Sequence, residues 1–247
     1  MKNLKIQATG CTDLGQIRLK NEDYFGIADN LFIVADGMGG HKSGEIASKL
    51  AVETIIDFFQ NELNKGEFKK DINLLIEKSI KKANKLVFQR SLNNENPNGM
   101  GTTIVLALFQ EPRVVHIANV GDSRAYLSRN DKLEVLSEDH SVTANLLRES
   151  LITKEEARNH PYHHHLTRSI GIKQDVEIYY HILNVLDGDK LLLCSDGLWN
   201  VLSDEEIKYV LQKKISIEKI CKELLNQVNK KNGSDNITAV VISVSND

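Results

Sequence analysis

The sequence predicts an α+β fold in which helices are layered on antiparallel sheets. Strand-like and helix-like segments come in blocks rather than in strict alternation, which argues against a doubly wound parallel sheet. The 15 glycines and 3 prolines form no linker, and no low-complexity tract or fixed-period repeat is visible. A chain of 247 residues is long enough to bury a substantial core. We therefore expect a single domain over residues 1–247.

The first block consists of strands followed by two helices. Short apolar runs predict strands at 5–9, 24–28 and 31–35. Apolar residues then recur at three- and four-residue spacing, which is the pattern of one helix face. The residues of the first stripe are Ala47, Leu50, Ala51, Thr54, Ile55 and Phe58, and those of the second are Ile72, Leu75, Ile76, Ile80, Ala83, Leu86 and Val87.

The second half of the chain is again rich in strands and closes with helices and one more strand. The same patterns predict strands at 102–109, 114–120, 123–128, 176–183, 190–195 and 237–244. Helices are expected near 203–212 and 216–229. Residues 141–169 read as short helices and loop.

Charge and hydropathy restrict the function classes. The 31 basic and 34 acidic residues nearly balance, unlike the basic excess of a nucleic-acid binder. The N-terminus lacks an apolar segment of signal-peptide length, and the longest apolar runs of about six residues fall short of the roughly twenty that cross a bilayer. We expect a cytoplasmic monomer that binds neither nucleic acid nor membrane.

The three cysteines predict neither a disulfide framework nor a zinc site. Cys11, Cys194 and Cys221 are an odd number without close pairs, which favours a reducing compartment. A nucleophilic cysteine in an anion-binding loop needs an arginine shortly after it, and none follows Cys194 or Cys221 within six residues. Cys194 is better interpreted as a small buried strand residue.

Four aspartates share one local pattern. Asp36 and Asp196 follow apolar runs and precede glycine, while Asp122 and Asp235 have a glycine one or two residues before them. Each alone fits an ordinary turn residue. Together they suggest carboxylates gathered at the rim of a sheet, where a divalent cation would remove their mutual repulsion. Oxygen ligands without His or Cys indicate Mg²⁺ or Mn²⁺ rather than zinc.

Eight motifs in order resemble the metal-dependent serine/threonine protein phosphatases of the protein phosphatase 2C type, in their compact bacterial form. They are "TDLGQIRLKNEDYFG" from position 12, "VADGMGGHKSGE" from 34, "GMGTT" from 99, "NVGDSRAY" from 119, "DHS" from 139, "LTRSIG" from 166, "CSDGLW" from 194 and "GSDNITAVV" from 233. Any one motif would be weak, but eight over about 230 residues are specific.

The resemblance implies a four-layer α-β-β-α sandwich with two metal ions at one edge. By the family pattern, Asp36 bridges both ions, the carbonyl of Gly37 binds one, and Asp196 and Asp235 hold the other. Asp122, together with Asp196, matches a third and weaker ion site of the bacterial members. The chemistry implied is hydrolysis of phosphoserine and phosphothreonine by a water activated between two ions roughly 3.5–4 Å apart.

The resemblance also assigns roles outside the metal ligands. Asp23 matches an outer carboxylate that holds metal-bound water, and Arg18 matches the phosphate-binding arginine, whose fork can bond two phosphate oxygens. Residues 142–168 match the flap, a mobile segment beside the active site. The partners implied are phosphoprotein substrates and a bacterial Ser/Thr kinase.

Histidines leave the general acid unidentified. His41 does not occupy the position of the histidine that follows Asp-Gly in animal members, where this chain has Met38, and a capping or surface role is expected. The cluster His163–His165, with His160 nearby, suggests metal binding by composition. Neighbouring side chains on an extended chain diverge, however, so a solvated loop is favoured. Trp199 is expected to be plain core.

Two other functions stay open at this stage. The chain could be a non-enzymatic relative that binds phosphoproteins, although such a protein would be expected to lack some metal-binding aspartates. It could also hydrolyse a small phosphate ester, or be a regulatory phosphatase of the sporulation or stress type.

Overall fold

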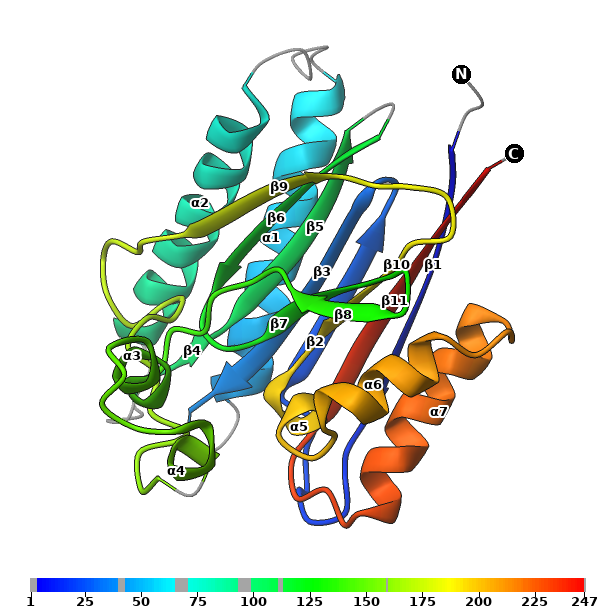
Figure 1. The fold of residues 1–247 in the computed structure, drawn as a ribbon. Helices are drawn as coiled ribbons and strands as arrows, with labels where there is room; N and C mark the ends of the chain where they lie inside the picture. The colour runs from blue at the N-terminus through cyan, green and yellow to red at the C-terminus, as the bar shows by residue number, and fades with distance from the viewer. Residues whose placement is uncertain are drawn as a thin grey trace.

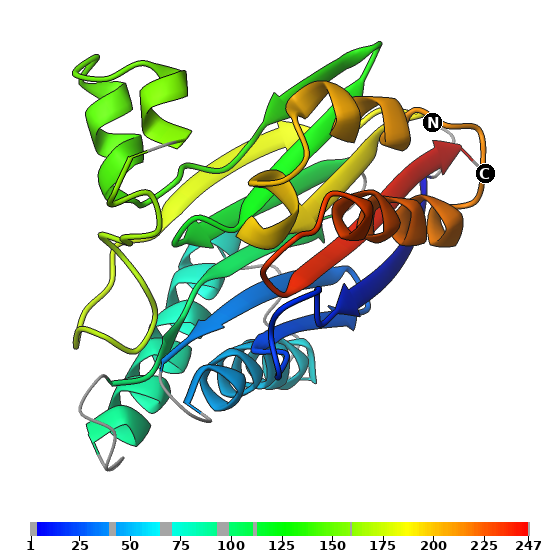
Figure 2. The same cartoon turned by 90° about the horizontal axis from the view of Figure 1, so that it is seen from below.

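Two antiparallel sheets lie face to face, each covered on its outer side by helices (Figures 1 and 2). The computed structural model describes residues 4–39, 43–64, 71–92, 99–110, 113–158 and 160–246. This arrangement confirms the four-layer α-β-β-α sandwich, which belongs to the α+β class.

The first sheet has six strands and the second has five. The first runs in the order β2 (Asp23–Ala28), β3 (Leu31–Met38), β5 (Ile104–Gln110), β6 (Val114–Val120) and β9 (Tyr179–Asn184), with β4 (Gly101–Thr102) paired to β3. The second runs β1 (Leu4–Asp13), β11 (Ile237–Asn246), β10 (Lys190–Cys194), β7 (Arg124–Arg129) and β8 (Lys132–Val135).

The helices form the two outer layers and one separate group. The first sheet is covered by α1 (Ser43–Asn64) and α2 (Ile72–Leu92), and the second by α5 (Asp196–Trp199), α6 (Asp204–Leu211) and α7 (Ile217–Lys230). The short helices α3 (Val142–Arg148) and α4 (Lys154–Arg158) stand apart at one end of the sandwich (Figure 2). They lie in the predicted flap, and an antiparallel bridge between Ser141 and Leu166 joins the two ends of that segment.

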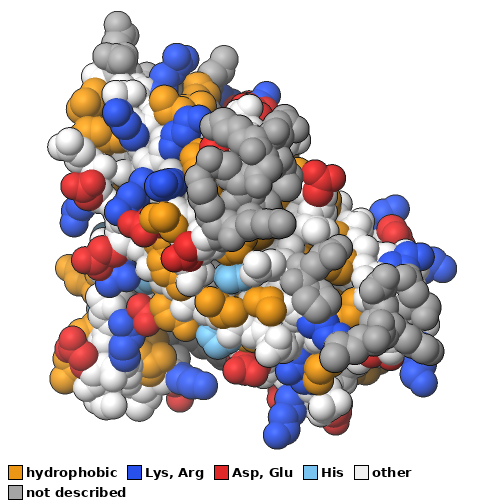
Figure 3. Space-filling view, turned by 90° about the horizontal axis from the view of Figure 1, so that it is seen from above, with side chains coloured by type: hydrophobic (Ala, Val, Ile, Leu, Met, Phe, Trp, Pro, Cys, Tyr) orange, Lys and Arg blue, Asp and Glu red, His pale blue; other side chains and the backbone are white. Residues whose placement is uncertain are grey.

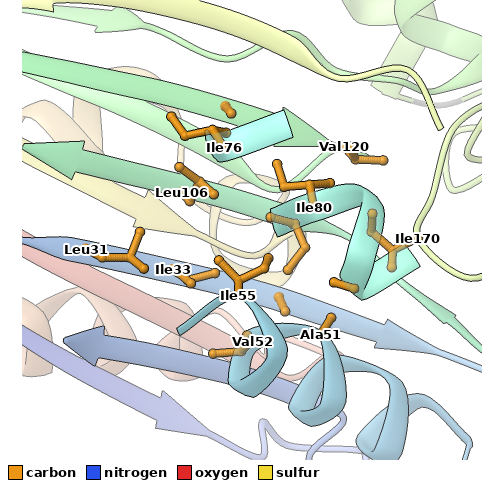
Figure 4. Close-up of a cluster of buried hydrophobic side chains, with 14 of the residues drawn as sticks. Leu31, Ile33, Ala51, Val52, Ile55, Ile76, Ile80, Leu106, Val120 and Ile170 are labelled. Atoms are coloured by element: carbon orange, nitrogen blue, oxygen red, sulfur yellow. The ribbon is translucent and has the colours of Figure 1, made fainter. Parts of the chain in front are cut away.

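The central strands β3, β5 and β10 are apolar without alternation because both of their faces are buried. Along β3, Leu31 and Ile33 pack toward α1 and α2, whereas Phe32 and Val34 pack between the sheets. Figure 4 shows the outer part of this core, where Ile55 of α1 points toward the strands. Successive side chains of a strand point to opposite faces, so a middle layer of the sandwich needs apolar residues at every position.

Most predicted elements are confirmed within a few residues, but three short ones were missed. The edge strand β8 is mostly charged or exposed, so it shows no apolar pattern. The predicted strand 102–109 is divided at Thr103 into β4 and β5. The four-residue helix α5 begins at Asp196, which was expected to lie at the end of a strand.

The expectation of no disulfide is wrong. Cys11 and Cys221 are bonded across 210 positions of sequence, and Cys194 is free and buried as expected. Cys11 lies on β1, and Cys221 lies on α7, which packs against the same sheet. Only this tertiary packing brings the two together, so spacing along the chain gave no sign of it. The cysteines therefore no longer support the prediction of a reducing compartment.

The surface carries both signs of charge. On the face seen in Figure 3, lysine and arginine side chains are interspersed with aspartate and glutamate. None of the helices in the described ranges combines the length and apolar character needed to traverse a bilayer.

Candidate active site

Asp36 is placed by the register of the first sheet. Its strand, β3, pairs antiparallel with β2, and Asp23 lies directly opposite Asp36. The backbone of Asp36 is held by the neighbouring chain: its N–H donates to Thr103 Oγ1 at 2.9 Å and its carbonyl accepts from the Thr103 N–H at 2.8 Å. The carbonyl also accepts from Thr102 Oγ1. The two threonines of "GMGTT" therefore fix the backbone of Asp36 in position.

The glycine after Asp36 is required by close packing. A Cβ at Gly37 would lie 2.1 Å from the carbonyl oxygen of Gly44 and 2.5 Å from that of Glu22. No larger residue fits without moving the start of α1 or the segment before β2. The glycine thus lets two other backbones approach Asp36.

Asp196 comes from the second sheet, at the point where β10 passes into α5. Ser195 is the N-cap residue of this helix, and its hydroxyl donates to Asp23 Oδ2 at 2.7 Å. The Ser195 N–H also bonds the carbonyl of Thr238 in β11. Ser195 therefore connects the two sheets directly beneath the carboxylates.

Asp235 comes from the loop before β11 of the second sheet, and Asp122 comes from the loop that connects β6 of the first sheet to β7 of the second. Asp235 precedes β11 and is partly buried. Asp122 is buried between β6 and β7, and the Trp199 indole N–H donates to its carbonyl at 2.9 Å. The guanidinium of Arg124 stacks 3.5 Å from the centre of the Trp199 ring. Trp199 is thus more than plain core, because it positions the backbone of a predicted ligand.

The carboxylate charges of the aspartates interact with one another. Burial raises the pKa of Asp36 well above its usual range, and the charges of Asp23, Asp196, Asp122 and Asp235 raise it further. Burial, together with the charges of Asp196 and Asp235, raises the pKa of Asp23 to about 7. The structure therefore brings together all five aspartates that the sequence singled out.

The donor set fits a hard divalent cation. It consists of carboxylate oxygens, which Mg²⁺ and Mn²⁺ prefer. The buried Oδ1 of Asp23 has no hydrogen-bond partner among the described residues, as expected of an atom facing a hydrated ion. Within the same ranges, no three His, Cys, Asp or Glu side chains are arranged closely enough to enclose one ion. Other partners hold two of the carboxylates, namely Arg18 on Asp235 and Asn200 on Asp196.

Arg18 reaches the carboxylates from the loop between β1 and β2. Its Nη2 donates to Asp235 Oδ2 at 2.8 Å, and half of the side chain is exposed. Its charge also interacts with that of Asp36. A cation at the mouth of an acidic cluster, open to solvent, is suited to bind a phosphate oxyanion.

The histidine tract contains a residue that the sequence did not single out. His164 Nδ1 lies 3.7 Å from Asp196 Oδ2, although 61% of its side chain is exposed. The Asp196 carboxylate beside the ring raises the pKa of His164. The tract is therefore not simply a solvated loop, since it touches a predicted ligand. No local pattern distinguishes His164 from its neighbours, and His41 lies outside the described residues.

Comparison with known proteins identifies the family. The family model described as protein phosphatase 2C matches residues 18–241. The chain belongs to the protein phosphatase 2C family. This phosphatase is 39% identical over 236 residues to the serine/threonine phosphatase stp of Listeria innocua, which covers 94% of this chain and 93% of that protein. The resemblance and the expected enzyme class, a protein phosphatase, are confirmed.

Solved structures agree with this assignment. A serine/threonine phosphatase of S. agalactiae superposes with a TM-score of 0.91 at 31% identity, covering 97% of this chain and 99% of that chain. The catalytic domain of the serine/threonine protein phosphatase PstP, solved in complex with two manganese ions, gives a TM-score of 0.86 at 30% identity and covers 98% and 100% of the two chains.

Proposed function

We propose that this protein hydrolyses phosphoserine and phosphothreonine in other proteins with the help of two Mn²⁺ or Mg²⁺ ions. The single observation that carries the proposal is the gathering of five aspartates whose charges disfavour one another without a cation. The manganese ions in the PstP domain support the choice of cofactor.

The proposed ligands are the residues that the sequence named. Asp36 and the Gly37 carbonyl would hold one ion, and Asp36, Asp196 and Asp235 the other. Asp122 and Asp196 would hold a third, weaker ion. When bound, the ions supply the Lewis-acid chemistry that activates water for in-line attack on phosphorus.

The chain's own residues bind and orient the reactants. Arg18 leaves Asp235 and bonds two oxygens of the phosphoryl group, which fixes phosphorus above the carboxylates. Asp23, anchored by Ser195 at Oδ2, has a buried Oδ1 without a hydrogen-bond partner among the described residues, and this oxygen would accept a proton from a water molecule. The residue that protonates the leaving alkoxide is left unassigned.

Partners and location follow from the same proposal. The enzyme would act on phosphoproteins and oppose a cognate bacterial Ser/Thr kinase, as a cytoplasmic monomer. The flap over 142–168 would contact the substrate protein, because His164 of that segment lies beside Asp196.

Two alternatives are less well supported. A non-enzymatic phosphoprotein binder would be expected to lack metal-binding aspartates, and all five are retained here. Hydrolysis of a small phosphate ester, or a role as a sporulation- or stress-type regulator, differs only in the substrate.

The decisive experiment measures phosphate release against ion identity. Mn²⁺, Mg²⁺ and Ca²⁺ are compared, with EDTA as the control, on a phosphothreonine peptide, a phosphoserine peptide and p-nitrophenyl phosphate. Turnover of both peptides that requires Mn²⁺ or Mg²⁺ is expected. Binding of the peptides without turnover under every ion would favour the non-enzymatic alternative, and turnover of the small ester alone would favour the small-ester hydrolase.

A further inference from the structure

The phosphate-binding candidate Arg18 lies on a loop that has no regular structure of its own. Residues 14–22 connect β1 to β2 and lie at the surface. Ile17 and Leu19, which flank Arg18, are 67% and 94% exposed, so packing of these neighbours does not fix the loop. An arginine that must meet phosphate in one orientation needs its backbone held by other means.

One buried side chain holds both ends of this loop. Asn236 is 5% exposed, and its Oδ1 accepts from the N–H of Glu22 at 2.8 Å. Its Nδ2 donates to the carbonyls of Leu14 at 3.0 Å and Lys20 at 2.9 Å. Three hydrogen bonds from one carboxamide therefore cross from the start of β11 to a loop more than 200 positions away in sequence.

The same two segments meet at further points. The N–H of Gln16 donates to the carbonyl of Gly233 at 3.1 Å. A Cβ at Gly15 would lie 2.1 Å from the carbonyl oxygen of Asp235, so this glycine lets the two backbones touch. Asp235, the immediate neighbour of Asn236, is also the residue that Arg18 bonds. The segment that presents a predicted metal ligand is thus the one that anchors the arginine loop.

We propose that Asn236 is a positioning residue that acts through Arg18: its side chain locks the 14–22 loop so that the guanidinium stands over the aspartate cluster. The inference rests on the proposed function, since it concerns binding of the substrate phosphate. Without the three bonds the loop gains conformations in which Arg18 faces solvent. Phosphate binding then weakens, because the arginine must be ordered each time a substrate binds.

The chain offers a matched control. Asn84 of α2 is 1% exposed and also makes three hydrogen bonds to one loop. Its Nδ2 donates to the carbonyls of Lys173 and Gln174, and its Oδ1 accepts from the N–H of Gly171. Asn84→Ala therefore removes the same number and kind of bonds from a loop that does not carry Arg18.

The test is a double-mutant cycle on a phosphothreonine peptide with Mn²⁺. Asn236→Ala is expected to raise KM about tenfold and to change kcat less than about threefold. In the Arg18→Ala background the same substitution should leave KM unchanged, because the residue through which it acts is gone. Asn84→Ala should leave KM at the wild-type value. If Asn236→Ala does not fold, Asn236→Leu, which keeps the number and branching of the side-chain heavy atoms but makes no hydrogen bonds, serves in its place.

Hydrogen exchange provides a readout independent of turnover. In the metal-free Asn236→Ala protein the amide of Glu22 should exchange at least about tenfold faster, while Asn84→Ala should leave it unchanged. An unchanged KM, or an equal rise of KM with and without Arg18, would overturn the inference alone. A wild-type protein without Mn²⁺- or Mg²⁺-dependent turnover would refute the proposed function and the inference together.

Discussion

The stretches around Asp36–Gly37 and Asp196–Gly197 have nearly the same sequence pattern but different structures. In each, an apolar run leads into Asp-Gly. The strand β3 continues through Asp36 to Met38, whereas β10 ends at Cys194 and a helix begins at Asp196. The same local pattern therefore serves as the middle of a strand in one sheet and as a strand-to-helix turn in the other.

What the two stretches share is a backbone packed against the glycine. A Cβ at Gly37 would meet Gly44, and a Cβ at Gly197 would lie 2.0 Å from the carbonyl oxygen of Asn236. The glycines are thus required by close approach of another chain segment rather than by an unusual φ. In both places, therefore, Asp-Gly marks a position where another backbone segment packs closely beside an aspartate, whatever the local secondary structure.

The largest expected effect tests whether the two aspartates are equivalent in function. Asp36→Asn and Asp196→Asn should each lower Mn²⁺-dependent release of phosphate from a phosphothreonine peptide by more than about a hundredfold, since even residues that only support metal ligands typically cost up to that factor. Asn200→Ala, which removes only a partner of Asp196, is the control and should retain most of the turnover. Near-normal turnover of either aspartate variant would reject the two-metal assignment.

The next effect concerns Arg18, whose charge acts on Asp235 and also on Asp36. Arg18→Ala is expected to raise KM for the phosphopeptide much more than it lowers kcat, by about tenfold or more, because it removes a bond to the phosphate in the ground state. Steady-state kinetics on the peptide measure both constants. An unchanged KM would exclude Arg18 from the phosphate site.

A smaller effect is expected on how the stability of the metal-free protein, kept in EDTA, depends on pH. With a pKa of about 7 in the folded state and about 4 when unfolded, Asp23 takes up a proton on folding between these pH values. The resulting stabilisation is complete below about pH 4 and is lost as the pH rises to about 7. The free energy of unfolding should therefore fall with rising pH, by at most about 1.4 kcal/mol per unit for this group.

Urea unfolding at pH 6.0 and 7.5 measures this dependence. Asp23→Asn should reduce it, with the buried Asp36 and Asp122 contributing the remainder, and saturating Mn²⁺ should reduce it further if the cluster binds the ion. A dependence that is the same in wild type and Asp23→Asn would show that another group causes it.

The smallest expected effect tests whether Trp199 of α5 positions the backbone of Asp122. Trp199→Phe keeps an aromatic ring against Arg124 but loses the N–H donor to the carbonyl of Asp122. Loss of this hydrogen bond should lower the free energy of unfolding by about 1 kcal/mol. It should also lower the affinity of the proposed third ion site for Mn²⁺ a few-fold. Titration of activity with Mn²⁺ measures the latter. If the titration curve does not move, Trp199 is only a packing residue.

The sequence by itself determined the layers of this fold and the chemical type of its site. The order of strand-like and helix-like blocks specified helices layered on antiparallel sheets, and the three- and four-residue stripes specified α1 and α2. Aspartates next to glycines specified an oxygen-donor site.

Only the tertiary structure decided which distant groups meet. Ser195 bonds Asp23 across the two facing sheets, Asn236 holds the Arg18 loop because β11 lies beside β1, and Cys11 bonds Cys221 because α7 packs on the sheet that contains β1. His164 reaches Asp196 from the segment between α4 and β9. Periodicity and local propensity act over a few residues, whereas these contacts depend on the packing of whole layers, which no local pattern encodes.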